Sequence, residues 1–218
     1  MATEIILPNR EEWLKARERG LGASDSGTII GVNSWKSNLD LYNEKVGISK
    51  TDDISEKPYV ILGNKEEPLI RDLFALENPQ YEVVFESAYK MIFNPSYNFL
   101  FCTPDGELIE RETGRKGILE IKTTEIRRPE QWKEWEGRIP QTYYAQVCHQ
   151  LICTGWEFAI LKARIRYYKN GELRIAERQY KITKDEAKKD MEFLLEAEKS
   201  FWDSVQKKTP PALVLPAI

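Results

Sequence analysis

The sequence predicts an α/β protein of the α+β kind, with helices packed against a mixed β-sheet. The first observation is the order of its segments: amphipathic stretches, then three runs rich in aromatic and β-branched residues, then a helix, a hairpin and a last helix. The second is Asn170-Gly171, a pair that suits the positive φ angles of a two-residue turn between strands. Two sequence periods in one short chain indicate strands and helices sharing one core.

The length of 218 residues is enough to bury the core of one domain without disulfides or structural metal. We therefore expect one domain over residues 1–208 and a Pro-rich tail over 209–218. Cys102 and Cys153 lie in apolar runs and are expected to be buried thiols, and with Cys148 they are too few and too scattered for a zinc cage. Reduced thiols, no leader and no apolar run of roughly 20 residues favour a cytoplasmic protein with no membrane span.

Capping residues predict the helices of the first half. The predicted helices are 9–19 with the Asn9–Glu12 pair as its cap, 24–31 with Ser24, 37–47 with Ser37, and 58–76 after a polar loop at 51–57. In the longest of them, the spacing predicts that Leu69, Ile70, Leu73 and Phe74 form the buried side.

Strands and two further helices make up the second half. The predicted strands are 81–92, 99–109, 117–123, 156–168 and 172–182, the last two joined by the Asn170-Gly171 turn. Pro140 suits the first turn of a helix that continues to about Thr154. Thr183 and Glu186 form a capping box for a last helix to about Val205.

The net charge of −3 neither favours nor excludes a nucleic-acid substrate. Proteins that coat DNA nonspecifically are usually basic, because contacts with phosphates supply most of that affinity. An enzyme that binds DNA through a divalent metal must carry carboxylates, and a basic channel can exist within an acidic total.

One short constellation carries chemistry. Asp105 follows Thr103-Pro104 at a bend, and fifteen residues later come Glu120 and Lys122. Side chains alternate along a strand, so Glu120 and Lys122 share a face and can both reach Asp105. Two close carboxylates repel each other unless a cation compensates them, and magnesium prefers such hard oxygen ligands. The alternatives are an ordinary Glu–Lys ion pair on an exposed strand and an ordinary Pro-Asp-Gly turn.

Asp105 followed by Glu120-Ile121-Lys122 resembles the signature of the PD-(D/E)XK nucleases, which have a restriction-endonuclease-like core. The surrounding sequence is similar to the YqaJ-like viral recombinases, a group that includes the lambda-type phage exonucleases. The matching stretches, in the family's order, are Trp13 to Ser24, Ser34-Trp35, Leu41 to Gly47, Gly63 to Pro68, Thr103 to Gly106, Leu119 to Thr123 and Tyr144 to Gly155.

The resemblance implies a role for eight residues. Glu67, Asp105, Glu120 and the Ile121 carbonyl would hold metal, Lys122 would be the catalytic lysine, Gln146 would position the attacked end or the water, and Arg17 and Ser24 would hold a terminal 5′-phosphate. Periodicity does not separate Glu67 from Glu66. For Arg17 the alternative is a solvated face, for Gln146 a core amide, and Asp25 either faces the phosphate pocket or caps a helix.

The resemblance also implies an activity and partners. It implies a 5′→3′ exonuclease that acts on double-stranded DNA ends, generates 3′ overhangs for recombination, and uses two Mg²⁺ ions per site with Mn²⁺ as a substitute. The implied partners are a single-strand annealing recombinase and further copies of the chain, most simply as a trimer, in the cytoplasm of a bacterial host. Alternatives are a structure-selective endonuclease or nickase of the same fold, and a DNA-end-binding module without turnover.

Three other side chains could have either a structural role or a role in substrate binding. Trp13 and Trp35 are expected in the core rather than as platforms for stacking bases. His149, the only histidine, has no metal-binding partner at a suitable spacing, so we expect it to be structural or to line the substrate site.

Overall fold

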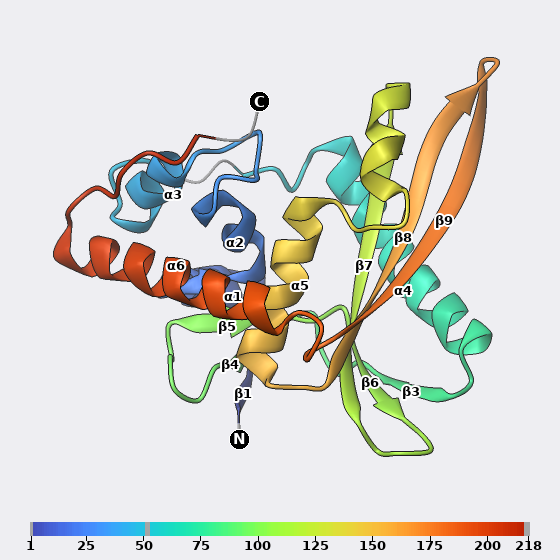
Figure 1. The fold of residues 1–218 in the computed structure, drawn as a ribbon, viewed down its shortest axis with the longest axis horizontal. Helices are drawn as coiled ribbons and strands as arrows, with labels where there is room; N and C mark the ends of the chain where they lie inside the picture. Colours follow the sequence, from blue (N-terminus) through green and yellow to red (C-terminus); the bar gives the residue numbers. More distant parts are fainter. Residues whose placement is uncertain (1, 51–52, 216–218) are drawn as a thin grey trace.

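The computed structural model describes residues 2–50 and 53–215. Thr51 and Asp52 of the expected loop and residues 216–218 of the expected tail lie outside the described residues. The helices are α1 Arg10–Arg17, α2 Ala23–Ile29, α3 Asn38–Lys45, α4 Pro58–Glu77, the 3₁₀-helix η1 Pro129–Trp135, α5 Gln141–Thr154 and α6 Lys188–Lys207 (Figure 1).

Nine strands form two mixed sheets, which confirms the predicted fold class. The smaller sheet has the order β1-β4-β5-β2 and the larger one the order β3-β6-β7-β8-β9. The strands are β1 Thr3–Ile6, β2 Leu21–Gly22, β3 Tyr81–Val84, β4 Lys90–Phe93, β5 Leu100–Cys102, β6 Gly106–Glu110, β7 Lys116–Ile126, β8 Phe158–Lys169 and β9 Glu172–Thr183.

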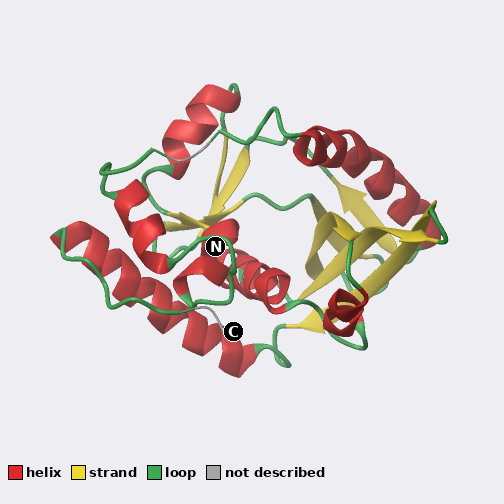
Figure 2. Cartoon of the chain, turned by 90° about the horizontal axis from the view of Figure 1, so that it is seen from above, coloured by secondary structure: helices red, strands yellow, loops and turns green. Residues whose placement is uncertain are grey.

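Helices cover both faces of the larger sheet. Leu119 and Ile121 of β7 pack with Ile70 and Phe74 of α4 on one face. Ile118 belongs to the larger core that includes residues of α5 and α6 on the other face. Figure 2 shows α4 on one side of the sheet and the cluster of the other helices on the opposite side. Neighbouring residues of β7 therefore point into different cores, as strand alternation requires.

The caps of two helices are confirmed and a third is wrong. The Asn9 side chain accepts a hydrogen bond from the Glu12 N–H, and Ser37 caps α3 through the Asp40 N–H. The prediction that Ser24 caps the second helix is wrong, because α2 begins one residue earlier with Gly22 as its N-cap. Asp25 accepts a hydrogen bond from the Gly22 N–H, so the cap comes from inside the first turn.

Two of the predicted strands are each divided between the sheets. The 81–92 run forms β3 in the larger sheet and β4 in the smaller one, and the 99–109 run is likewise split into β5 and β6. The second break falls at Thr103-Pro104-Asp105, where proline lacks the N–H that a ladder needs. The chain thus crosses between sheets just before Asp105. Strands β1 and β2 and the helix η1 were not predicted.

The predicted buried side of α4 is half wrong. Ile70 and Phe74 are buried, whereas Leu69 is 67% exposed and Leu73 is also exposed. Arg71 takes a buried position on this helix instead. The buried face is thus rotated away from the predicted one, because α4 serves a site with polar groups as well as an apolar core.

The second half follows its turn signals. Asn170 and Gly171 both have positive φ angles between β8 and β9, which confirms the hairpin. Pro140 is the N-cap of α5, and Gly155 ends that helix in the left-handed region. Thr183 and Glu186 exchange the hydrogen bonds of a capping box in the turn that leads into α6.

Several single residues complete the comparison with the sequence. The cysteines Cys102, Cys148 and Cys153 are free and buried, as expected for the first and last. Trp13 is half-buried, and the expectation that Trp35 is in the core is wrong. Asn38 binds the tail, since its side chain donates to the Ala212 carbonyl and accepts from the Val214 N–H. Across residues 2–50 and 53–215, no helix is long and apolar enough to cross a membrane.

Candidate active site

Asp105, Glu120 and Lys122 converge at the junction of β6 and β7. Gly106, next to Asp105, pairs with Leu119, so the register of the two strands sets the carboxylates beside each other. The Ile121 N–H donates to Asp105 Oδ2 at 2.7 Å, and Lys122 Nζ lies 2.7 Å from Glu120 Oε1. The expected proximity of these three side chains is therefore present in the fold.

Burial makes the electrostatics of this group unfavourable for three negative charges. Burial, the Glu120 charge and the Glu67 charge together raise the pKa of Asp105 well above its ordinary value. Burial also raises the pKa of Glu67, with the Glu120 charge adding to it against the opposing effect of Arg71. For Lys122, burial lowers the pKa, but the Glu120 and Asp105 carboxylates raise it more. The carboxylates of the cluster therefore favour the protonated form of Lys122. The positive charges of the cluster are too few to offset the repulsion among the carboxylates.

Glu66 and Glu67, which the sequence could not separate, face different surroundings. Glu66 pairs with Arg166 at 2.5 Å and lies 3.6 Å from Arg164, both on the face of β8 that α4 covers. Glu67 pairs with Arg71, whose Nε donates to the Asp105 carbonyl at 2.5 Å. Only Glu67 is coupled electrostatically to Asp105 and Glu120. The geometry thus brings Glu67, and not Glu66, to the cluster.

Gln150 of α5 is a site residue that the sequence analysis missed. Its side-chain nitrogen donates to Glu120 Oε2 at 2.6 Å, and its Oε1 is buried with no hydrogen-bond partner among the described residues. Gln146, the predicted residue, is half-buried one turn earlier, and within the described part of the chain Glu120 is bound by Gln150 and not by Gln146. Gln146 and Gln150 share a helix face, and that shared face was the signal that could have found Gln150.

The donor atoms of this cluster are of the kind that a hard divalent cation prefers, although the oxygens of Glu67, Asp105 and Glu120 do not all lie within 4.8 Å of one another. Three carboxylates, from Glu67, Asp105 and Glu120, face two cationic side chains, Lys122 and Arg71, which leaves an excess of one formal negative charge. Raised carboxyl pKa values and the unpartnered buried Gln150 oxygen indicate a place where positive charge and a hydrogen-bond donor are missing. Oxygen ligands of this kind suit magnesium or manganese.

A second acidic group has a different explanation. Glu4, Glu86 and Glu107 bring carboxylate oxygens close together in the geometry of a metal site. The ammonium group of Lys90 lies at their centre and pairs with all three. Because the Lys90 ammonium group already takes the position between these carboxylates, this group is a structural ion-pair cluster that ties β1 and β4 to β6.

Arg17 and Ser24, predicted to hold a terminal phosphate, lie together. Arg17 Nη2 donates to Ser24 Oγ at 2.9 Å, and the guanidinium lies 4.7 Å from the centroid of the Trp13 ring and 5.9 Å from that of Phe101. Trp13 in turn donates through Nε1 to Thr103 Oγ1 at 3.3 Å, two residues before Asp105. Arg17 is thus held by two aromatic rings beside the active-site turn, not spread on a solvated face.

Asp25 is compensated from within the protein. Its Oδ2 lies 3.0 Å from Lys45 Nζ and accepts from the Gly22 N–H. Burial raises the pKa of Asp25, but Lys45, Arg17 and the Gly22 hydrogen bond together lower it below its ordinary value. The Asp25 charge is therefore offset by the hydrogen bond of the helix cap and by the ion pair with Lys45. This agrees with the alternative that Asp25 caps a helix.

His149 is a structural residue. It is fully buried, with Nδ1 2.6 Å from Glu198 Oε1 on α6 and Nε2 2.8 Å from the Phe101 carbonyl. Burial lowers the pKa of His149, but the Glu198 carboxylate and these hydrogen bonds raise it more. The residue joins α5, α6 and β5 behind the candidate site.

Comparisons with known proteins give the chain a family context. The sequence model of the YqaJ-like viral recombinase domain matches residues 12–157. The chain is 32% identical over 216 residues to the uncharacterized protein YqaJ of Bacillus subtilis (strain 168), a match covering 96% of this chain. The chain spans 62% of that relative's length. The matched family segment contains every residue of the candidate site.

Solved structures share the fold at low sequence identity. An alkaline exonuclease from Laribacter hongkongensis has a TM-score of 0.63 and 19% identity, covering 91% of this chain and 94% of its own. The same exonuclease in complex with dAMP gives 0.62 and 20%, with the same coverage of both chains. A phage-related exonuclease from Haemophilus somnus 129PT gives 0.52 and 12%, covering 87% of this chain and 96% of its own. The shared architecture is that of phage-type exonucleases.

Proposed function

The chain belongs to the family of the YqaJ-like viral recombinase domain, and from this premise we propose that it is a divalent-metal-dependent exonuclease that degrades double-stranded DNA from its 5′ ends. The product is a duplex with a 3′ single-stranded overhang suited to recombination. The similar solved structures are of exonucleases, and the family is one of viral recombinases. Both support an enzyme that acts on DNA ends.

One observation carries the proposal. Asp105, in the turn before β6, meets Glu120 and Lys122 of the paired strand β7 in a partly buried cluster that has more carboxylate charge than its own cations compensate. In the Lys90 cluster the cation pairs with all three carboxylates, whereas among the described residues no lysine or arginine forms an ion pair with Asp105. An uncompensated carboxylate cluster is expected where a dication and a phosphodiester bind.

The side chains of the site have separate tasks. Glu67, Asp105, Glu120 and the Ile121 carbonyl would hold magnesium, with manganese as a substitute and two ions per site. When bound, the metal supplies charge stabilisation to the phosphoryl oxygens and lowers the pKa of attacking water. Lys122, held protonated at 2.7 Å from Glu120, binds and orients the water or a phosphoryl oxygen.

The surrounding residues position that group. Gln150 fixes one oxygen of Glu120 while Lys122 takes the other, so the carboxylate has a single orientation. Arg71 joins Glu67 to the backbone of Asp105 and thereby sets α4 against the turn. Tyr143 lies over Lys122, with Nζ 5.2 Å from the ring centroid, and restricts the lysine from the side of α5.

The position of Arg17 and Ser24 supports attack from the 5′ end. A terminal phosphate carries more negative charge than an internal diester, and a guanidinium binds its oxygens through charge-assisted hydrogen bonds. Trp13 contacts Arg17 through its ring and Thr103 through its Nε1, so an end bound by Arg17 and Ser24 would place the first diester bonds toward Asp105. This arrangement supports 5′→3′ polarity.

Assembly and partners extend the proposal. An acidic chain has little electrostatic attraction to DNA, so a ring of copies, most simply a trimer, would keep the enzyme on its substrate between cuts. The exposed apolar side chains of α4, among them Leu69, Leu73 and Leu76, provide surface for contacts between copies. A single-strand annealing recombinase is the expected recipient of the 3′ overhang.

Digestion of an end-labelled duplex tests the proposed activity. A linear, 5′-phosphorylated duplex is labelled at either the 5′ or the 3′ end of one strand and digested with magnesium or with a chelator. We expect early release of the 5′ label, late release of the 3′ label and no release with the chelator. Cutting of a closed circle would instead identify an endonuclease or nickase, and binding without any release would identify an end-binding module.

A further inference from the structure

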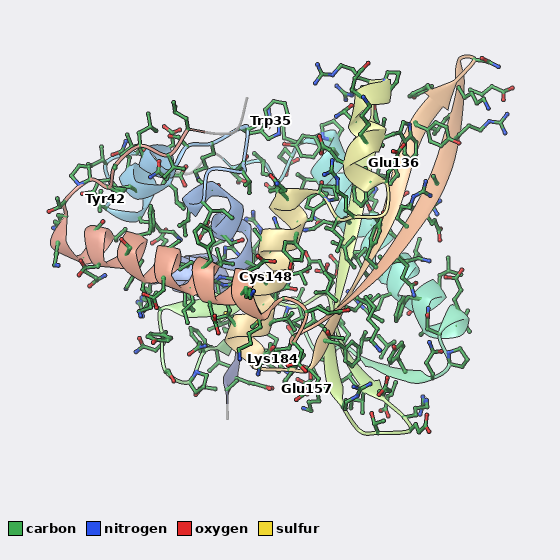
Figure 3. All side chains as sticks on the ribbon, viewed as in Figure 1. Trp35, Tyr42, Glu136, Cys148, Glu157 and Lys184 are labelled. Carbon is green, nitrogen blue, oxygen red and sulfur yellow. The ribbon has the colours of Figure 1, made fainter. Side chains whose placement is uncertain are left out.

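Trp35 is presented to solvent in a way that intramolecular packing does not explain. Its residue surface is 95% exposed, which makes it the most exposed large hydrophobic side chain among the described residues. Burying an aromatic ring stabilises a protein by a few kcal/mol, so a tryptophan fully in water forgoes a large gain. Figure 3 shows Trp35 at the outer edge of the molecule, near the end of α5 where that helix begins.

The loop that carries Trp35 is held by side-chain hydrogen bonds. Asn33 accepts from the Trp35 N–H at 2.9 Å and donates to Thr28 Oγ1 at 2.9 Å. The N–H groups of Val32 and Asn33 both donate to the Gly27 carbonyl. The segment that leads to Trp35 is therefore fixed, and the exposed ring stands on a defined backbone rather than on a free segment.

The same loop abuts the helix that contributes to the active site. Thr142 Oγ1, in the first turn of α5, donates to the Val32 carbonyl at 3.0 Å. The next residue, Tyr143, lies over Lys122. Trp35 follows Val32, the residue that contacts α5, by three positions. Tyr143 of the same helix contacts Lys122. Trp35 thus lies on a loop that packs against the first turn of α5, the helix that also carries Tyr143.

The chemistry around the ring is compatible with a polyanion. Residues 26–39 contain no aspartate or glutamate, although the whole chain carries a net charge of −3. Lys36 follows Trp35 and pairs with Glu44, and Asn33 and Ser34 precede it. A single aromatic ring with polar neighbours differs from the continuous apolar patch that protein partners take, and resembles the way in which nucleic-acid-binding proteins present rings to bases.

We propose that Trp35 stacks on a nucleobase of the DNA substrate next to the active site and so holds the end while Lys122 and the carboxylates act. The proposal rests on the proposed function for its substrate class, and adds a specific contact from the loop that packs against α5. Its role is positioning: the ring binds a base that is not the one being released. Stacking on any base is possible, so the contact adds affinity without sequence preference.

Binding measurements separate this proposal from the question of catalysis. In Lys122→Ala protein, which keeps the carboxylates, fluorescence anisotropy measures the Kd for a labelled 5′-phosphorylated duplex with magnesium present. Adding Trp35→Ala should raise the Kd by about 5- to 100-fold, whereas Trp35→Phe should recover most of the affinity. Phe193→Ala, which removes another exposed ring, on α6, is the matched control and should leave the Kd unchanged.

Abasic substitution locates the contact. Duplexes carrying one abasic site at each terminal position of either strand are bound by the two proteins. At one position the abasic site should raise the Kd of the protein that keeps Trp35. The same abasic site should leave the Kd of the Trp35→Ala protein unchanged. In cleavage assays with the native Lys122, Trp35→Ala should raise KM for duplex and leave the rate on bis(p-nitrophenyl) phosphate, which lacks a base, unchanged.

Two results would overturn the stacking contact. The first is a Kd for the Trp35→Ala protein that lies within twofold of the Kd of the protein with Trp35. The second is a loss of affinity in Trp35→Ala that is the same on every abasic duplex, which would mean that Trp35 does not contact a base. A failure of the proposed nuclease function would look different, because then no label is released in magnesium while the binding comparison still reports on Trp35.

Discussion

The side-chain nitrogen of Gln150 lies 2.6 Å from Oε2 of Glu120, so helix α5 holds a carboxylate of strand β7 across the face of the larger sheet. Both residues are buried, and Lys122 binds the other carboxylate oxygen. An orientation fixed from two sides is what a metal ligand needs, because a misplaced ligand loses most of its effect.

Gln150→Ala should lower kcat while leaving KM near its native value. A hydrogen bond to a charged group contributes about 1.5–3 kcal/mol, which corresponds to roughly a 10- to 100-fold loss of rate if Glu120 turns away. Steady-state kinetics on duplex ends measure the effect, and Gln141→Ala, at the exposed start of α5, is the control. A larger loss for Gln146→Ala than for Gln150→Ala would assign the positioning role to Gln146.

Arg17→Ala should remove most of the preference for phosphorylated over hydroxyl 5′ ends. A charge-assisted bond of about 1.5–3 kcal/mol predicts a native preference of roughly 10- to 100-fold. Initial rates on the two kinds of end, for the native and variant proteins, give the preference directly. Lys15→Ala lies on the exposed side of the same helix and serves as the control. A native protein without preference, or a variant that keeps it, would move the phosphate site away from Arg17.

Asp105→Asn should abolish activity without lowering the metal-free Tm. Asparagine keeps an oxygen for the Ile121 N–H while removing one of three neighbouring negative charges, so the metal-free fold should hold or gain stability. The increase in Tm that magnesium gives the native protein should disappear. Thermal unfolding with and without magnesium measures both effects.

Glu107→Gln provides the opposite case for comparison. Glu107 pairs with Lys90, whose pKa is raised because its three carboxylate partners outweigh the effect of burial. Removing this partner should lower the Tm by about 2–4 °C for each kcal/mol lost, with no effect on the response to magnesium. If Asp105→Asn destabilised the metal-free protein as Glu107→Gln does, the Asp105 cluster would be structural.

The buried pair of His149 and Glu198 should make stability depend on pH. The pKa of His149 is raised above its unfolded value of about 6.5, so the stabilisation by the pair is fully present below that pH and is lost as pH rises through the folded pKa. The negative charge of Asp25 also raises the pKa of His149, and Cys153 Sγ lies 3.3 Å from His149 Nε2. The difference in Tm between the native protein and Glu198→Gln should therefore be largest at acid pH.

Thermal unfolding of these two proteins between about pH 5.5 and 9 measures that difference across the unfolded pKa of histidine. It should shrink steadily as pH rises. A difference that stays constant or grows with pH would mean that His149 is neutral in the folded protein and that Glu198 serves only as a hydrogen-bond acceptor.

Local sequence patterns correctly predicted the features that are set by residues close together in the chain, such as strand faces and turns. The alternation of Leu119, Glu120 and Ile121 gave the correct faces of β7, and Asn170-Gly171 gave the correct turn. The 99–109 run, however, was predicted as one strand although Pro104 marked a break. Whether a chain continues in one sheet or crosses to another depends on distant partners, which local propensity does not contain.

The positions that the sequence left open depend on packing across the fold. Glu66 and Glu67 are adjacent on one helix, and only the rotation of α4 against β8 decides that Glu66 meets Arg166. Gln150 was missed because its partner lies 30 residues away on another strand. Trp35 was misplaced because hydrophobicity predicts burial on average, and a single exposed position can depart from that average.

The most direct test of the active-site assignment is the rate of nucleotide release from a 5′-phosphorylated linear duplex as magnesium is titrated, for the native protein and for Lys122→Ala. The native protein should have no activity with a chelator and a rate that saturates with magnesium. Lys122→Ala should be slower by at least about 100-fold at every magnesium concentration, as expected for loss of a group that stabilises charge in the transition state. Full activity in Lys122→Ala, or native activity that persists with the chelator, would contradict the assignment of Asp105, Glu120 and Lys122 as a metal-dependent nuclease site.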